Sequence, residues 1–277
     1  MPQSALCDGK SAAECGTVEG RPSALFDSWE RIARRVRPAK HIALFLDFDG
    51  TLAAYRSRPD EARLSASACQ ALLKLTGHRH VRIAIVSGRR RAALAHFIKI
   101  PRIELMGLYG WEQGKKAAHL RRNTLAKLSE ARDLLTTIAR EAPDVFVEDK
   151  CLSLVVHYRG ASPRSREIAR ARLRDAALHL APDLHLIRGE NSLELVPREV
   201  RGKGAAVRAL LKRIPKPVLP IYIGDDLTDE PAFSALRSGI TIRVGTGRST
   251  AARFGLAHSE EVCVFLARLE AELPRHG

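Results

Sequence analysis

An apolar run that ends in two carboxylates constrains the fold of this chain more than any other segment. The run His41–Leu46 is typical of a buried strand, and Gly50 is expected to turn the chain after it. Side chains alternate along a strand, so Asp47 and Asp49 share one side and Phe48 takes the other. Unpaired carboxylates are costly to bury, so this segment predicts a bound cation with a phosphate group opposite it rather than a solvated loop.

Three further segments place polar side chains at the end of a predicted strand or at the start of a predicted helix. The apolar strand 81–86 ends at Ser87, and the strand 221–223 ends in a carboxylate cluster that includes Asp225. Lys203 lies between two glycines at the start of an apolar-periodic helix. Ligands of open parallel sheets bind at the carboxyl ends of the strands. Together the segments therefore supply a nucleophile, a second acid, a hydroxyl donor, a cation and metal ligands.

Strand and helix patterns alternate through most of the chain, which predicts an α/β fold with a parallel, Rossmann-like sheet. Core strands are expected at 42–46, 81–86, 103–108, 218–223 and 240–244. Core helices are expected at 23–36, 65–76, 90–98, 203–213, 229–236 and 260–272. Between the two halves of this core, an αββαββ pattern predicts an α+β cap, with helices at 123–141 and 164–180 and strands at 145–148, 152–158, 184–188 and 192–196.

The predicted cap is an insertion in the core, so the motifs of the core converge only after folding. We expect an N-terminal tail and helix at 1–40, with disorder over 1–22. The catalytic core is then 41–112 together with 198–277, and the cap is 113–197. The hinges should lie near 111–114 and 197–202.

Composition limits the class of protein. No apolar run among the 277 residues approaches the roughly 20 residues of a membrane helix, and residues 1–20 lack the apolar segment of a secretory signal. Five cysteines without a C-x-x-C pair argue against zinc or a disulfide framework and fit a reducing cytoplasm. Cys69, Cys151 and Cys263 fall in periodic segments and are expected in the core. We predict a cytoplasmic protein without membrane association.

The net charge of +15 raises the question of nucleic-acid binding. Lysine and arginine are dispersed over the predicted helix faces, and aromatic residues make up only 5% of the chain. A solvated basic surface explains this pattern best, with a modest attraction for an anionic substrate. We therefore expect no nucleic-acid partner.

The four motifs resemble those of a known enzyme family. D-F-D-G-T-L at 47–52, S-G-R at 87–89, the glycine-flanked Lys203 and G-D-D-L-T-D-E at 224–230 match haloacid-dehalogenase-type phosphatases in order. The last motif is similar to the form found in trehalose-6-phosphate phosphatases. Three other segments are also similar to that family, at 107–112, 152–159 and 193–197, and Tyr109 stands where the family often has histidine.

The resemblance implies roles for the core residues. Asp47 is the expected nucleophile, which forms an aspartyl-phosphate, and Asp49 the acid that protonates the leaving sugar and then activates water. Ser87 would donate a hydrogen bond to the phosphoryl group, although serine is also a preferred helix N-cap. Lys203 would pair with the nucleophile and the phosphoryl oxygens. Mg²⁺ would bind Asp47, the main-chain carbonyl of Asp49, and Asp225.

Other acids and the cap residues follow from the same resemblance. Asp226 or Asp229 is expected to support the metal ligands from behind. Sugar-contacting positions are matched by Glu112, Lys150, Arg159 and Glu194. His157 belongs to a matching strand and is equally compatible with a structural hydrogen bond.

The motifs predict Mg²⁺-dependent hydrolysis of trehalose 6-phosphate to trehalose and phosphate, within trehalose biosynthesis, by a protein that we expect to be monomeric. The alternative is the same chemistry on another sugar phosphate, such as a glucosyl- or mannosyl-3-phosphoglycerate or sucrose phosphate. A phospho-accepting regulator would also use a strand-end aspartate, a hydroxyl and a lysine. It would need neither Asp49 nor a cap of more than 80 residues.

Overall fold

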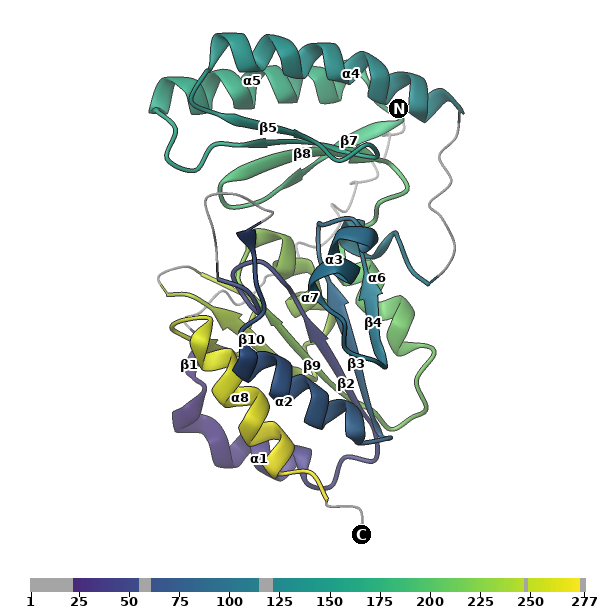
Figure 1. Ribbon diagram of the computed structural model, residues 1–277, viewed down its shortest axis with the longest axis vertical. Helices are drawn as coiled ribbons and strands as arrows, with labels where there is room; N and C mark the ends of the chain where they lie inside the picture. Colours follow the sequence, from purple (N-terminus) through teal and green to yellow (C-terminus); the bar gives the residue numbers. More distant parts are fainter. Residues whose placement is uncertain (1–21, 55–60, 115–121, 247–248, 275–277) are drawn as a thin grey trace, which may run out of the picture.

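The computed structural model describes residues 22–54, 61–114, 122–246 and 249–274. A parallel sheet flanked by helices forms the lower body in Figure 1, and an antiparallel sheet with two helices forms the cap above it. The predicted disordered tail falls almost wholly outside the described residues. Among the described helices, none is long and apolar enough to cross a bilayer.

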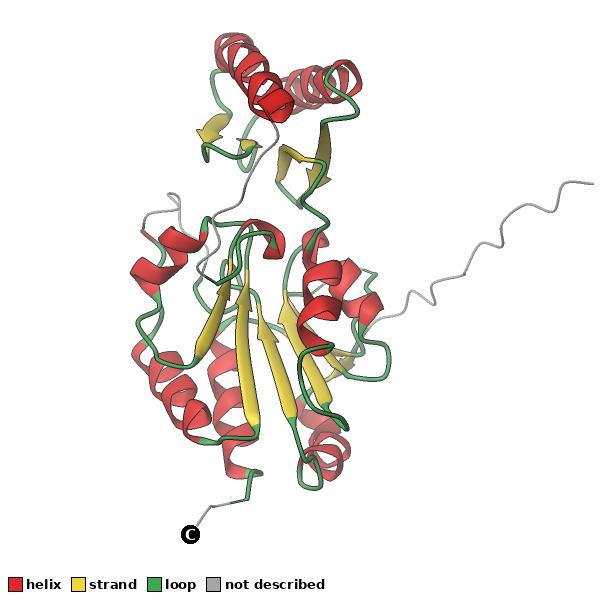
Figure 2. Cartoon of the chain, turned by 90° about the vertical axis from the view of Figure 1, so that its right-hand side faces the viewer, coloured by secondary structure: helices red, strands yellow, loops and turns green. Residues whose placement is uncertain are grey.

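The core sheet contains seven parallel strands within the described residues, in the order β1-β11-β10-β9-β2-β3-β4. Its strands are β1 (Ser23–Ala24), β2 (Ile42–Leu46), β3 (Val81–Val86), β4 (Ile103–Met106), β9 (Leu219–Gly224), β10 (Ile240–Val244) and β11 (Phe254–Leu256). The central neighbours β3, β2 and β9 carry three of the sequence motifs. Their carboxyl ends therefore meet at one edge of the sheet, below the cap (Figure 2).

Alternating side chains of the sheet bury both of its faces. Leu44 and Leu46 of β2 belong to the hydrophobic cluster that includes α1, α2 and α8, whereas Phe45 belongs to the cluster of α6 and α7. The helices are α1 (Trp29–Val36), α2 (Ala66–Gly77), α3 (Arg91–Phe97), α6 (Lys203–Leu211), α7 (Glu230–Ala235) and α8 (Glu260–Ala271). Short 3₁₀ turns are η1 (Phe26–Ser28), η3 (Leu108–Gly110) and η4 (Leu227–Asp229).

The cap sheet separates its two helices from the core. Its elements are α4 (Arg122–Glu141), β5 (Phe146–Asp149), β6 (Leu154–His157), α5 (Pro163–His179), β7 (Leu184–Arg188) and β8 (Ser192–Pro197). The strands pair antiparallel in the order β5-β6-β8-β7, and α4 and α5 cover the face away from the core (Figure 1). Leu193 and Leu195 pack in the cluster of these helices, so Ser192 and Glu194 take the opposite face. The predicted fold class, including the αββαββ order, is confirmed; the domain boundaries stay predictions.

The structure corrects one prediction near the N-terminus of the core. The helix expected over 23–36 begins as α1 only at Trp29, because Ser23–Ala24 forms an edge strand on β11. The amide of Ser23 donates to the carbonyl of Arg253 at 3.1 Å. Strands of two and three residues carry too little periodicity to be detected in sequence.

Other departures are local. The strand expected over 103–108 ends at Met106, because the 3₁₀ turn η3 follows. The helix expected over 229–236 is divided between η4 and α7. Cys151 is exposed at a turn with a φ of 67°, so the prediction that it lies in the core is wrong.

Candidate active site

The floor of the site is a buried ion pair at the carboxyl end of β2. Asp47 is 4% exposed, and its amide donates to the carbonyl of Ile223 on β9 at 2.9 Å. Nζ of Lys203 lies 2.8 Å from Oδ1 of Asp47. Lys203 opens α6 after Gly202, whose φ of 79° is strained for any residue with a side chain. The glycine before the lysine therefore turns the chain so that the ammonium group reaches Asp47.

Asp229 holds this pair from behind. One of its carboxylate oxygens accepts hydrogen bonds from Lys203 at 2.8 Å and from the phenol of Tyr222 at 2.6 Å. The other accepts from the backbone amides of Asp225 and Asp226 at 3.2 and 3.0 Å. Asp229 is fully buried, so these four donors satisfy a charge that water does not reach. Of the two acids expected behind the metal ligands, the geometry favours Asp229.

Burial and crowding shift the titration of the pair. Burial raises the pKa of Asp47 well above its usual value; Lys203 opposes this, and the charges of Asp229 and Asp225 reinforce it. Burial alone would lower the pKa of Lys203, but Asp229 and Asp47 raise it above its ordinary value. Lys203 is therefore charged at neutral pH, and it is one cation among three carboxyl groups. A metal ion bound among them would supply the further positive charge that favours the ionised form of Asp47.

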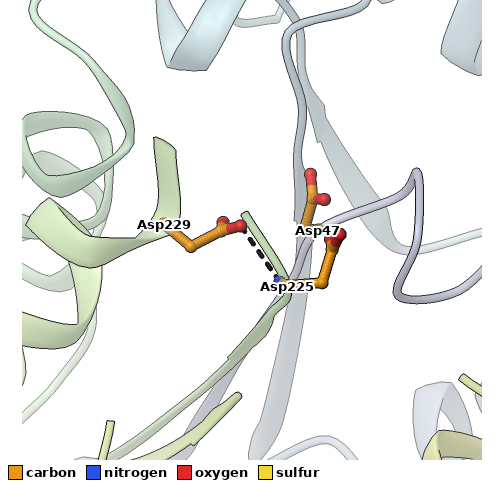
Figure 3. Close-up of side chains that lie close together, drawn as sticks. All are labelled: Asp47, Asp225 and Asp229. Atoms are coloured by element: carbon orange, nitrogen blue, oxygen red, sulfur yellow. Dashed lines mark hydrogen bonds between the residues drawn. The ribbon is translucent and has the colours of Figure 1, made fainter. Parts of the chain in front are cut away.

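The carboxylates can supply oxygen ligands to such an ion. Asp47, Asp225 and Asp229 each offer an oxygen, and these oxygens lie within 4.8 Å of one another (Figure 3). Asp229 already accepts four hydrogen bonds, so Asp47 and Asp225 are the better ligands. Thr51 donates to Oδ1 of Asp225 at 3.1 Å, which orients that carboxylate. A hard donor set of this kind fits Mg²⁺.

Asp49 forms a two-pronged ion pair. Nε of Arg89 lies 2.7 Å from one of its carboxylate oxygens, and a terminal nitrogen of the same guanidinium lies 2.6 Å from the other. Arg89 lies over the rings of Phe48 and Phe97, 5.3 and 5.2 Å from their centroids. Its guanidinium group is thereby held in place. The S-G-R motif thus brings to the site an arginine to which the sequence had assigned no role.

Ser87 lies at the end of β3 and is 1% exposed. Its hydroxyl oxygen accepts from the amide of Arg89 at 3.2 Å, so it orders the turn after the strand. The alternative interpretation, an N-cap of the following helix, does not hold, because α3 begins at Arg91 and its N-cap is Arg90. Ser87 lines the same cavity as Asp47 and Asp49.

This cavity has a volume of about 690 Å³ and lies between core and cap. Its lining from the core includes Asp47, Asp49, Ser87, Arg89, Tyr109, Lys203 and Asp226. Its lining from the cap includes Asp144, Phe146, Glu148, Lys150, His157, Arg159, Asn191, Ser192 and Glu194. The volume is in the range of small-molecule sites.

Glu194 joins the cap to the core. Its carboxylate accepts from the phenol of Tyr109 at 2.5 Å, from Ser153 at 2.6 Å and from Lys150 at 3.2 Å. Lys150 also donates to the carbonyl of Gly88 at 3.3 Å. A Cβ on Gly88 would lie 2.9 Å from the Tyr109 ring, so the glycine of the S-G-R motif makes room for this tyrosine.

Glu112 is bound by residues at the start of α3. It is buried, and it pairs with Nε of Arg90 at 2.7 Å and accepts from the amide of Arg91 at 2.6 Å. It therefore caps the first turn of α3. Among the described residues that line the cavity, Glu112 is absent. A sugar contact by this residue stays a prediction, and the geometry favours a structural role.

Lys150, Arg159 and His157 all line the cavity. The sugar contacts expected of Lys150 and Arg159 stay predictions. Nε2 of His157 lies 2.9 Å from a carboxylate oxygen of Glu148. Burial pushes the pKa of Glu148 up, but the hydrogen bond from His157 and the charge of Lys150 leave it below its ordinary value. Glu148 is therefore a hydrogen-bond acceptor at neutral pH. The alternation of side chains along β5 could have identified Glu148 as a residue of the cavity, because Glu148 shares a face of the strand with Phe146.

Comparison with known proteins decides the family. The sequence model described as trehalose-phosphatase matches residues 45–259. This chain belongs to the trehalose-phosphatase family. The resemblance that the motifs predicted is thereby confirmed.

The curated relatives of this chain differ from it in length. A probable trehalose-phosphate phosphatase D of Arabidopsis thaliana is 32% identical over 269 residues, which cover 90% of this chain and 72% of the relative. The trehalose-phosphate phosphatase of Mycobacterium avium is 33% identical over 254 residues, or 85% of this chain and 64% of the relative. An uncharacterized glycosyl hydrolase of Mycobacterium tuberculosis is 34% identical over 256 residues, or 87% of this chain and only 19% of that protein. The chain therefore corresponds to a part of some of its relatives.

Solved structures share the fold. The C-terminal domain of trehalose-6-phosphate phosphatase from Candida albicans superposes with a TM-score of 0.75 at 20% identity, and covers 92% of this chain and 99% of that one. A trehalose-6-phosphate phosphatase related protein gives 0.68 at 24% identity, with 83% and 97% covered.

Proposed function

We propose that this protein is a Mg²⁺-dependent phosphatase that hydrolyses trehalose 6-phosphate to trehalose and phosphate. The observation that carries the proposal is the buried Asp47–Lys203 pair at the floor of a cavity whose roof is the polar face of the cap sheet. Relatives that are named trehalose-phosphate phosphatases support the choice of substrate. We further propose that the protein acts in the cytoplasm, in trehalose biosynthesis.

In the first step, a carboxylate oxygen of Asp47 attacks the phosphorus atom, and the bond between phosphorus and the sugar oxygen breaks. Asp49 donates a proton to that oxygen, so trehalose leaves as a neutral alcohol. Lys203 and the hydroxyl of Ser87 compensate the charge that builds up on the phosphoryl oxygens. When Mg²⁺ is bound by Asp47 and Asp225, it supplies further positive charge at the phosphoryl group.

In the second step, Asp49 accepts a proton from a water molecule, whose oxygen attacks the phosphorus of the aspartyl-phosphate. The bond between phosphorus and Asp47 breaks, and inorganic phosphate leaves. Arg89 occupies one acceptor site on each oxygen of Asp49. The remaining lone pairs of the carboxylate stay available for proton exchange with the leaving group and with water.

The lining of the cap favours a neutral leaving group. It carries several carboxylates, including Asp144, Glu148 and Glu194, and carboxylates can accept hydrogen bonds from sugar hydroxyls. These acids would repel the carboxylate of a phosphoglycerate leaving group. The other sugar phosphates considered from sequence are therefore less compatible with the site when their leaving group is acidic.

A substrate panel tests the proposal. Phosphate release is measured for trehalose 6-phosphate, sucrose 6-phosphate, glucose 6-phosphate and glucosyl-3-phosphoglycerate, with Mg²⁺ and with EDTA. We expect trehalose 6-phosphate to have the highest kcat/KM and EDTA to abolish turnover. A higher kcat/KM for the glycerate compound, or full activity in EDTA, would refute the proposal.

A further inference from the structure

An exposed aromatic ring stands on the face of the cap sheet that lines the cavity. Phe146 is 54% exposed, which makes it unusual among the large apolar side chains of this protein. Its neighbour Val147 packs against the hydrophobic cluster of the cap, so Phe146 and Glu148 both take the opposite face. Both residues line the same cavity as Asp47 and Asp49.

The ring is held at one edge by its cross-strand partner. Phe146 lies directly opposite His157 in the pairing of β5 with β6. The two ring centroids are 5.6 Å apart and the planes are inclined by 31°. His157 is in turn fixed by its 2.9 Å contact with Glu148. The position of Phe146 is therefore defined, although about half of the residue is exposed.

This combination has the chemistry of a pyranose-binding surface. A sugar ring presents apolar C–H groups on its faces and hydroxyls around its edge. An aromatic ring can cover the C–H face, while an adjacent carboxylate and imidazole hydrogen-bond the hydroxyls. The other large apolar side chains that are exposed in the described residues, such as Leu125 and Leu178, do not line this cavity.

We propose that Phe146 is a specificity-determining residue whose ring covers a face of one glucose unit of the leaving group, while Glu148 and His157 bind hydroxyls of the same unit. The proposal rests on the proposed function, because it takes a sugar as the leaving group. Phe146 contributes to substrate binding and not to the chemistry at phosphorus.

The test compares wild type with Phe146→Ala, Phe146→Leu and Phe146→Tyr. The leucine variant keeps apolar volume without a ring, and the tyrosine variant keeps the ring. Leu178→Ala is the matched control, since Leu178 is 79% exposed on α5, on the far side of the cap sheet. Three quantities are measured for each protein: kcat and KM for trehalose 6-phosphate, and the inhibition constant of the product trehalose.

We expect the alanine and leucine variants to raise KM and the trehalose inhibition constant about tenfold, with kcat within about twofold of wild type. This factor corresponds to about 1.4 kcal/mol of binding free energy. The tyrosine variant and the Leu178 control should stay within about twofold for all three quantities. Circular dichroism establishes that each variant is folded; if the alanine variant is not, the leucine and tyrosine variants carry the comparison.

Three results would overturn the proposal for Phe146 alone. These are an unchanged inhibition constant in the leucine variant, an equal loss in the leucine and tyrosine variants, and a loss confined to kcat. Failure of the proposed function has a separate signature, because it is seen with wild type in the substrate panel: the glycerate compound has the higher kcat/KM, EDTA leaves full activity, or no sugar phosphate is hydrolysed. In the last case the role of Phe146 falls with the proposed function.

Discussion

The phenol of Tyr109 donates a 2.5 Å hydrogen bond to the carboxylate of Glu194, and this contact joins the core to the cap. Tyr109 lies in η3 with a φ of 57°, a backbone conformation that is uncommon for a residue with a bulky side chain. Both residues are buried. A bond between two parts of the chain that are 85 residues apart therefore fixes the position of the cap carboxylate.

We expect Tyr109→Phe to destabilise the protein, because it removes a donor from a buried carboxylate and leaves the ring in place. Hydrogen bonds to charged groups contribute about 1.5–3 kcal/mol. Scanning calorimetry should show a lower unfolding temperature than wild type. Unfolding at the wild-type temperature would mean that Lys150 and Ser153 satisfy Glu194 without the phenol.

The same bond predicts a pH dependence at the alkaline end. Burial, followed by the charge of Glu194, raises the pKa of Tyr109 well above its ordinary value. A raised pKa in the folded state stabilises the protein below the unfolded value of about 10, and the contribution is lost as the pH rises through the folded pKa. The difference in unfolding temperature between wild type and Tyr109→Phe should be constant from about pH 7 to 9 and shrink above about pH 10. A constant difference up to pH 11 would contradict this interpretation.

Glu194→Ala should be more disruptive than Tyr109→Phe, because Lys150 then loses its carboxylate partner in a site where only 12% of the lysine side chain is exposed. Breaking a buried ion pair costs about 3–5 kcal/mol. We also expect kcat/KM for trehalose 6-phosphate to fall about ten- to hundredfold more than for p-nitrophenyl phosphate, if Glu194 reaches the sugar. Glu167→Ala on the exposed face of α5 is the control. Equal losses on both substrates would restrict Glu194 to a structural role.

The Arg89–Asp49 pair predicts a coupled effect of two substitutions. We expect Arg89→Ala to lower kcat about tenfold, because Asp49 loses the group that holds both of its oxygens. In an Asp49→Asn background the same substitution should have little further effect, since Arg89 acts through Asp49. The measurement is a double-mutant cycle on kcat for trehalose 6-phosphate. Multiplicative losses would show that Arg89 contributes independently of Asp49.

The Asp47→Asn variant should depend less than wild type on Mg²⁺ for its thermal stability, because it lacks the carboxylate that the metal ion would neutralise. Because burial raises the pKa of Asp47, its ionised form opposes folding at neutral pH. We expect Asp47→Asn to abolish turnover but to unfold in EDTA at a temperature no lower than wild type. Mg²⁺ should raise the unfolding temperature of wild type more than that of the variant. An equal shift in both proteins would exclude Asp47 as a ligand.

Much of the fold and of the floor of the candidate site was predictable because the information is local. Strand and helix patterns are periodic over short windows, and parallel strands bring their carboxyl ends to one edge of the sheet. Asp47, Ser87 and Asp225 could therefore be assigned to one site from three separate segments. The short strands Ser23–Ala24 and Phe254–Leu256 were missed because their pairing with neighbouring strands, and not their own pattern, makes them strands.

The sequence alone determined which residues reach the carboxyl edge of the core sheet, since alternation and strand ends are properties of the chain itself. The tertiary structure decided what those residues contact. It turned Glu112 toward the first turn of α3, placed Arg89 on Asp49 and set Tyr109 against Glu194. Each of these contacts joins segments between 21 and 85 residues apart, and its geometry depends on how whole elements pack. No local periodicity encodes that geometry.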